Sequence, residues 1–133
     1  MGWQKYREGL TANPDSVRIG YFLYDETYSG VIDSQAIDVV RFYNSNNEHH
    51  ALLLTALPLR NNIAVLKKFQ QVLPAQWIRS ICAFPQRIQT KFQNLESRRI
   101  ANLIDKSGID VLICRNAVSC HLALKARKIL PNL

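Results

Sequence analysis

The chain has 133 residues, a length that fits one compact domain and leaves no room for a second of ordinary size. Apolar residues make up 47% of the chain and charged residues 20%, a balance that excludes a fully disordered protein. The net charge of +7 is unevenly divided, because residues 1–66 carry 5 basic against 7 acidic side chains and residues 67–133 carry 12 against 3.

No segment approaches the roughly 18–20 consecutive apolar residues of a membrane-spanning helix, and the first residues hold no hydrophobic run typical of a secretion signal. A cytoplasmic protein is therefore expected. The cysteines agree, since Cys82, Cys114 and Cys120 are odd in number, widely spaced and mostly set in apolar runs. This pattern is typical of reduced core cysteines and predicts no disulfide framework.

Residues 1–16 are polar, close on an Asn-Pro-Asp turn, and are interpreted as a lead-in segment. Residues 17–24 are β-branched and aromatic, which predicts a first strand buried on both faces. After a turn of small residues, a helix of mixed faces is expected from Val31 to about Tyr43. Residues 50–57 predict a second buried strand that runs into Pro58.

The alternation continues through the second half of the chain. Asn61 or Asn62 is expected to cap a helix that ends near Leu73, with Ile63, Leu66 and Phe69 on its apolar stripe. The remaining predicted elements are a strand at 77–84, a helix at 91–106 ended by Ser107 and Gly108, a strand at 109–114, and a helix at 117–129.

The order βαβαβαβα, in units of about 30 residues, predicts an α/β fold in which a parallel sheet of about four strands is covered by helices on both faces. This is a Rossmann-like three-layer α/β/α architecture over 17–133, of either the Rossmann or the flavodoxin-like type. Ligands in such sheets bind at the carboxyl ends of the strands, where loops and helix N-termini converge.

Four predicted loops meet at that edge, and they supply the candidate substrate-binding residues. The first loop holds a single glycine, so it is neither a dinucleotide fingerprint nor a Walker motif, and a tight strand-to-helix turn is an equal interpretation of its glycine. The other three loops each carry an arginine. The candidates are Ser29, Gly30, Arg60, Arg87, Arg115 and Asn116.

Catalytic residues of the usual kinds are not indicated. His121 falls inside a helix, and His49 and His50 lie at the amino end of a strand, so a structural or solvent-exposed role is favoured for all three. Cys114, Cys120 and His121 match no zinc-ligand spacing, and no metal site and no cofactor are expected.

The basic second half favours an anionic partner, although a solvated helix face explains the same residues equally well. The candidate contacts with an anionic membrane or polyanion are Lys67, Lys68, Lys91, Arg98 and Arg99. Nucleic acid is disfavoured, because the basic residues are not interleaved with aromatics in a known recognition pattern.

Residues 19–42, IGYFLYDETYSGVIDSQAIDVVRF, and residues 109–128, IDVLICRNAVSCHLALKARK, resemble the amino-terminal domain of a GT-B-fold glycosyltransferase of the family 4 type. The likeness covers roughly residues 17–130. Two positions depart from the family pattern: Ser29-Gly30 stands where two glycines are frequent, and Arg115-Asn116 where a histidine often follows the strand. The resemblance leaves Arg115 and Asn116 as contact residues and supplies no acid–base residue there.

The resemblance implies an acceptor-side domain of an enzyme that moves a sugar from a nucleotide-sugar donor to a saccharide or lipid-linked acceptor. The donor site of such enzymes lies mainly in a carboxyl-terminal Rossmann-like domain, so a partner domain of the same enzyme is expected beyond Leu133 and no turnover by the chain alone. A position at the inner membrane face is also expected. The alternative is a stand-alone flavodoxin-like or receiver-like binding module.

Overall fold

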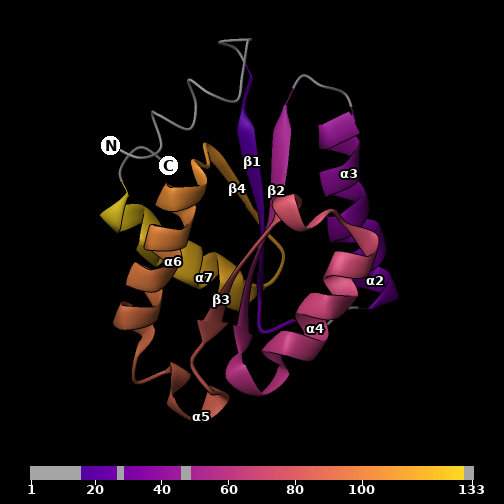
Figure 1. The fold of residues 1–133 in the computed structure, drawn as a ribbon. Helices are drawn as coiled ribbons and strands as arrows, with labels where there is room; N and C mark the ends of the chain where they lie inside the picture. Colours follow the sequence, from indigo (N-terminus) through magenta and orange to yellow (C-terminus); the bar gives the residue numbers. More distant parts are fainter. Residues whose placement is uncertain (1–15, 27–28, 46–48, 131–133) are drawn as a thin grey trace.

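The computed structural model describes residues 16–26, 29–45 and 49–130, with the side chains of 59–62 and 86 outside that description. The predicted lead-in, apart from Ser16, lies outside the described residues. A parallel sheet forms the middle layer (Figure 1). Its strands are β1 (Arg18–Tyr24), β2 (His50–Pro58), β3 (Ile78–Ala83) and β4 (Val111–Cys114).

The sheet has the order β3-β2-β1-β4, and each adjacent pair of strands is parallel. The predicted α/β fold with about four parallel strands is therefore confirmed. The order is that of the Rossmann fold and differs from the flavodoxin-like order 2-1-3-4-5, which the sequence left open. Strands β2 and β3 lie on one side of β1, and β4 lies on its other side. The topological switch point, where the order in which strands are added changes sides, is therefore between β1 and β4.

The helices cover both faces of the sheet (Figure 1). One face carries α2 (Gly30–Ile32), a π-helical segment (Asp33–Ile37), α3 (Asp38–Ser45) and α4 (Leu59–Val72). The other carries α6 (Gln93–Ser107) and α7 (Ala117–Ile129). Two short elements flank β3, a 3-10 turn (Ala75–Trp77) before it and α5 (Gln86–Gln89) after it.

Strand β1 sends alternate side chains to two separate cores. Tyr21 and Leu23 pack with α3 and α4, whereas Phe22 and Tyr24 pack with α6 and α7. Gly20 also faces the second core, where a methyl group added to it would lie 3.0–3.2 Å from the ends of three aliphatic side chains. Because β1 is covered on both faces, every residue after Arg18 is buried and none of them is charged, as the prediction of a doubly buried strand requires.

Several predicted boundaries and faces are wrong in detail. Helix α4 begins at Leu59, directly after Pro58, so neither Asn61 nor Asn62 caps it. Pro58 is the last residue of β2, where it is paired with Ala83. Its backbone is extended, and the helix begins at the next residue. The buried stripe of α4 runs through Val65, Phe69 and Leu73, and the side chain of Ile63 is 70% exposed.

The end of α6 agrees with the sequence, because Gly108 adopts a left-handed backbone with φ 65° and its N–H donates to the carbonyls of Ile104 and Asp105. The start of α6 differs from the prediction. The helix predicted from residue 91 begins at Gln93, after the separate short helix α5. Two apolar residues near this start, Phe92 and Leu95, are exposed.

Glu96 is a buried carboxylate in the first turn of α6 that the apolar pattern did not single out. Its Oε2 accepts a hydrogen bond of 3.2 Å from the backbone N–H of Phe84, and its Oε1 is buried without a partner among the described residues. Arg99 lies 3.7 Å away. Burial raises the pKa of Glu96, and the Phe84 N–H and Arg99 only partly oppose it.

The variant Glu96→Gln is expected to lose a pH dependence of stability that the wild type has. Because the pKa of Glu96 is higher in the folded chain than in the unfolded one, its contribution to stability is present at low pH and is lost as pH rises. As the pH rises from about 4 to about 7, the free energy of unfolding of the variant should therefore increase relative to that of wild type. Urea denaturation at both pH values measures this, and an unchanged difference would refute it.

Candidate functional site

The switch point between β1 and β4 gathers residues from two loops. Asp25 and Glu26 follow β1, and Arg115 and Asn116 follow β4. The backbone of Asp25 is left-handed, with φ 53°, and its N–H donates a 2.8 Å hydrogen bond to the carbonyl of Ala56. Aspartate tolerates this conformation better than most residues, and the local strain turns the chain sharply at the end of the strand.

Glu26 and Arg115 form an ion pair across the switch point. Arg115 Nη1 lies 3.3 Å from Glu26 Oε1, and the side chains are 25% and 19% exposed for Arg115 and Glu26 respectively. The second carboxylate oxygen, Glu26 Oε2, is buried and has no hydrogen-bond partner among the described residues. Burying a carboxylate oxygen that accepts no hydrogen bond costs folding free energy, so the site is suited to a ligand or water that donates one.

Tyr21 lies within electrostatic reach of the same pair. Burial raises the pKa of its phenol, Arg115 opposes that effect, and Glu26 adds to it. The phenol therefore stays protonated at neutral pH and remains a hydrogen-bond donor. The described site combines a carboxylate and a guanidinium at the carboxyl edge of the sheet, with the buried phenol of Tyr21 near enough to be influenced by both.

Two helices begin at this edge. The hydroxyl of Ser29 caps α2 by accepting a 3.4 Å hydrogen bond from the N–H of Ile32. Asn116 caps α7, because its Oδ1 accepts a 2.8 Å bond from the N–H of Ser119 and the Ser119 hydroxyl accepts one from the N–H of Asn116. Both residues lie where the sequence predicted them, and these contacts give each a structural role. Their contact with substrate stays a prediction.

Gly30 is the first residue of α2 and faces open space, since a methyl group added to it would meet nothing within 4 Å. Its φ is not in the left-handed range, unlike that of Gly108. A tight turn therefore does not require glycine here, and the open space leaves the backbone accessible to a ligand.

The variant Asn116→Ala is expected to lower the free energy of unfolding by about 1 kcal/mol, because it removes the reciprocal cap of α7. Asn116→Ser should retain most of the stability, since serine caps helices about as well as asparagine. Thermal denaturation of both variants makes the comparison. Equal losses in the two would show that the cap is not the cause.

Two arginines of the predicted site, Arg87 and Arg115, lie far apart. Arg87 is exposed on α5, which follows β3, whereas Arg115 follows β4. Since β3 and β4 are the two outer strands, three strand spacings separate them, or roughly 14 Å. Arg60 lies in the first turn of α4, and its side chain is outside the described residues. Of the two arginines whose side chains are described, Arg115 is the one at the switch point.

The basic residues predicted to contact a membrane or polyanion lie on different helices. Lys67 and Lys68 are exposed on α4, and Arg98 is exposed on α6, which covers the opposite face of the sheet. Lys91 is exposed just before α6. Arg99 is already engaged, because its guanidinium lies over the ring of Phe84 at 5.1 Å and near Glu96. A shared anionic contact for these residues stays a prediction.

The histidines occupy positions consistent with the structural interpretation. His49 Nδ1 accepts a 3.1 Å hydrogen bond from the N–H of Val17, and His121 is exposed on α7. Within ranges 16–26, 29–45 and 49–130, no three His, Cys, Asp or Glu side chains gather as metal ligands would. Over the same ranges, no helix has the length and apolar character needed to cross a bilayer.

Comparison of the chain with models of protein families, with curated proteins and with solved structures gave no significant match. The site is therefore interpreted from its own geometry.

Sequence reasoning named Arg115 as a candidate and did not single out Glu26, with which Arg115 forms an ion pair in the structure. The sequence indicates this pair by an acidic residue just after one strand and a basic residue just after another. The two can be matched only when β1 and β4 are known to be neighbours.

Proposed function

We propose that this chain is the amino-terminal, acceptor-side domain of a GT-B-fold glycosyltransferase of the family 4 type. In this proposal the switch-point site binds hydroxyl groups of a saccharide or lipid-linked acceptor, and a second Rossmann-like domain holds the nucleotide-sugar donor. The observation that carries the proposal is the buried oxygen Glu26 Oε2, which has no partner among the described residues and lies beside Arg115.

The chemistry of the site suits a polyhydroxylated ligand. A sugar hydroxyl can donate to Glu26 Oε2 and at the same time accept from the guanidinium of Arg115. Hydrogen bonds to charged groups contribute about 1.5–3 kcal/mol each, more than neutral ones, so one well-placed pair confers useful specificity. A free phosphate fits less well, because the carboxylate beside Arg115 repels it.

The fold supports the same proposal. The strand order is that of a Rossmann-like domain, and the candidate residues lie at the carboxyl edge, where such domains bind ligands. The alternative, a flavodoxin-like or receiver-like binding module, would have a different strand order. In a transferase of two such domains, closure of the cleft over this edge would exclude water from the reacting sugar.

Saturation-transfer NMR tests the proposal on the chain itself. Neutral mono- and disaccharides are expected to bind saturably, and nucleoside diphosphates to bind weakly or not at all. The variant Arg115→Leu should reduce saccharide binding at least tenfold, a loss of about 1.4 kcal/mol, whereas Arg98→Leu on the exposed face of α6 should not. Preferential binding of nucleoside diphosphates would contradict an acceptor-side role.

A further inference from the structure

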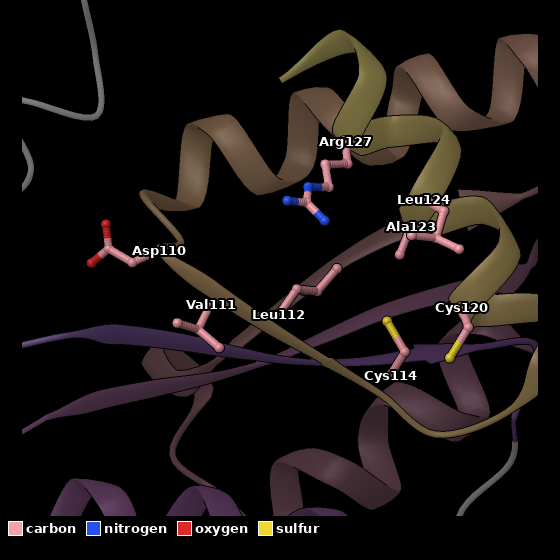
Figure 2. Close-up of a pocket in the computed structure, with 8 residues that line it drawn as sticks. All are labelled: Asp110, Val111, Leu112, Cys114, Cys120, Ala123, Leu124 and Arg127. Atoms are coloured by element: carbon pink, nitrogen blue, oxygen red, sulfur yellow. The ribbon is translucent and has the colours of Figure 1, made fainter. Parts of the chain in front are cut away.

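Cys114 and Cys120 lie together in a groove between β4 and α7 (Figure 2). The groove has a volume of about 550 Å³, and its apolar lining includes Leu112 and Leu124. Cys114 is the last residue of β4 and Cys120 lies in the first turns of α7. Both side chains line the groove, and the Cys120 thiol lies near enough to contribute to the raised pKa of the Cys114 thiol.

The backbone on both sides of this thiol pair is fixed. Cys114 is paired with Phe22 in the sheet, and the N–H of Cys120 donates a 3.0 Å hydrogen bond to the carbonyl of Asn116. The cap formed by Asn116 and Ser119 holds the intervening loop. A disulfide needs Cβ atoms about 3.8 Å apart, a distance that the backbone of residues 114–120 sets, and rotation of the two side chains then brings the sulfur atoms together.

The two thiols differ in accessibility. Cys120 is exposed, whereas Cys114 is half-buried. Burial, followed by the neighbouring Cys120, raises the pKa of the Cys114 thiol to about 12. Cys114 therefore stays protonated at neutral pH, and an oxidant from solution reaches Cys120 first. An exposed cysteine beside a second thiol is an arrangement found in redox-sensing proteins.

We propose that Cys114 and Cys120 are a redox-active pair that hydrogen peroxide converts to an intramolecular disulfide. The Cys120 sulfur attacks the peroxide, the O–O bond breaks, and the products are Cys120 sulfenic acid and one water. The Cys114 sulfur then attacks the Cys120 sulfur and displaces hydroxide, which takes the Cys114 proton and leaves as a second water. Two thiols are oxidised by two electrons, and one peroxide is reduced to two waters.

The disulfide would close a ring that contains Arg115 and Asn116. Oxidation would restrict the loop that carries Arg115 toward Glu26, and so would change ligand affinity at the switch point. This consequence rests on the proposed function, whereas formation of the disulfide does not. A thiol measurement made without any saccharide therefore tests the pair even if the saccharide proposal fails.

The test treats the reduced chain with a small molar excess of hydrogen peroxide and counts thiols in denaturant. The count is expected to fall from three to one, with a mass loss of two hydrogens and a peptide linking Cys114 to Cys120. Cys82→Ser is the matched control and should still form the link. Cys114→Ser should instead accumulate a Cys120 sulfenic acid that dimedone traps, and Cys120→Ser should form neither product.

Retention of three thiols in the wild type, a link that involves Cys82, or a link between two chains would each overturn the proposal. Dimedone labelling of wild type equal to that of Cys114→Ser would also overturn it, because Cys114 would then not resolve the sulfenic acid. Circular dichroism of each variant before treatment confirms that the comparison is made between folded chains.

Discussion

Replacing Gly20 with valine is expected to lower the free energy of unfolding by about 1–3 kcal/mol. Gly20 lies in the middle of the sheet, and a Cβ there would stand 3.0 Å from Leu54 Cδ1, 3.1 Å from Leu112 Cδ1 and 3.2 Å from Ile109 Cδ1. Leu54 is fully buried and Ile109 nearly so, which leaves their methyl groups little room to move. The two further methyl groups of valine make the overlap larger.

Gly30→Val is the matched control, because nothing lies within 4 Å of the Cβ that it would add. We expect this variant to stay within about 0.5 kcal/mol of wild type, as surface substitutions usually do. Urea denaturation of both variants gives the two values under identical conditions. Equal stabilities for the two variants would mean that the side chains of Leu54, Ile109 and Leu112 pack more loosely around Gly20 than the distances indicate.

Replacing Arg115 with leucine is expected to have two separable effects. Stability should fall by about 1–2 kcal/mol, because Glu26 remains partly buried without its counter-charge; the loss is smaller than for a fully buried pair since both side chains keep some exposure. Saccharide binding should fall at least tenfold, because a charged hydrogen-bond donor is removed from the site.

The double variant Arg115→Leu with Glu26→Gln separates those effects. Neutralising Glu26 removes the unpaired charge, so stability should return to within about 0.5 kcal/mol of wild type, while saccharide binding should stay weak. Denaturation and saturation-transfer NMR on the same samples measure both quantities. If binding recovered together with stability, the loss in Arg115→Leu would come from unfolding of the loops, and the site would lie elsewhere.

Much of the fold follows from patterns in the sequence that act locally. Strands β1 and β2 are covered on both faces, which selects the continuous apolar runs that predicted them. Helix α7 was predicted within its observed bounds, and Gly108 ends α6 because a left-handed residue there costs glycine little. In these places a short window of sequence contains the whole physical cause.

Features that depend on neighbouring elements could not be predicted in that way. The first turn of α4 follows Pro58 without a polar cap, which a search for capping residues overlooks. Ile63 and Leu124 match an apolar stripe but point to solvent, because the sheet covers only part of each helix. Cys120 was grouped with core cysteines, yet it is exposed, because the groove between α7 and the edge strand β4 is open to solvent.

The candidate residues were drawn from all the loops at the carboxyl edge of the sheet, whereas the ion pair joins only two of those loops. The sequence alone does not distinguish one arginine after a strand end from another. The strand order places Arg87 and Arg115 at opposite sides of the sheet. The same order brings an acidic residue of the first half, Glu26, against a basic residue of the second half, Arg115. The ion pair at the switch point thus joins the acidic half of the chain to the basic half.

Chemical-shift mapping tests most directly the central claim that the switch point between β1 and β4 binds a polyhydroxylated ligand. Isotope-labelled chain would be titrated with the neutral disaccharide that binds best in the saturation-transfer experiment, and amide shifts followed residue by residue. Our account predicts saturable shifts concentrated at Asp25, Glu26, Gly30, Arg115 and Asn116. Shifts concentrated around Arg87 and β3, or the absence of saturable shifts with any neutral saccharide, would contradict it.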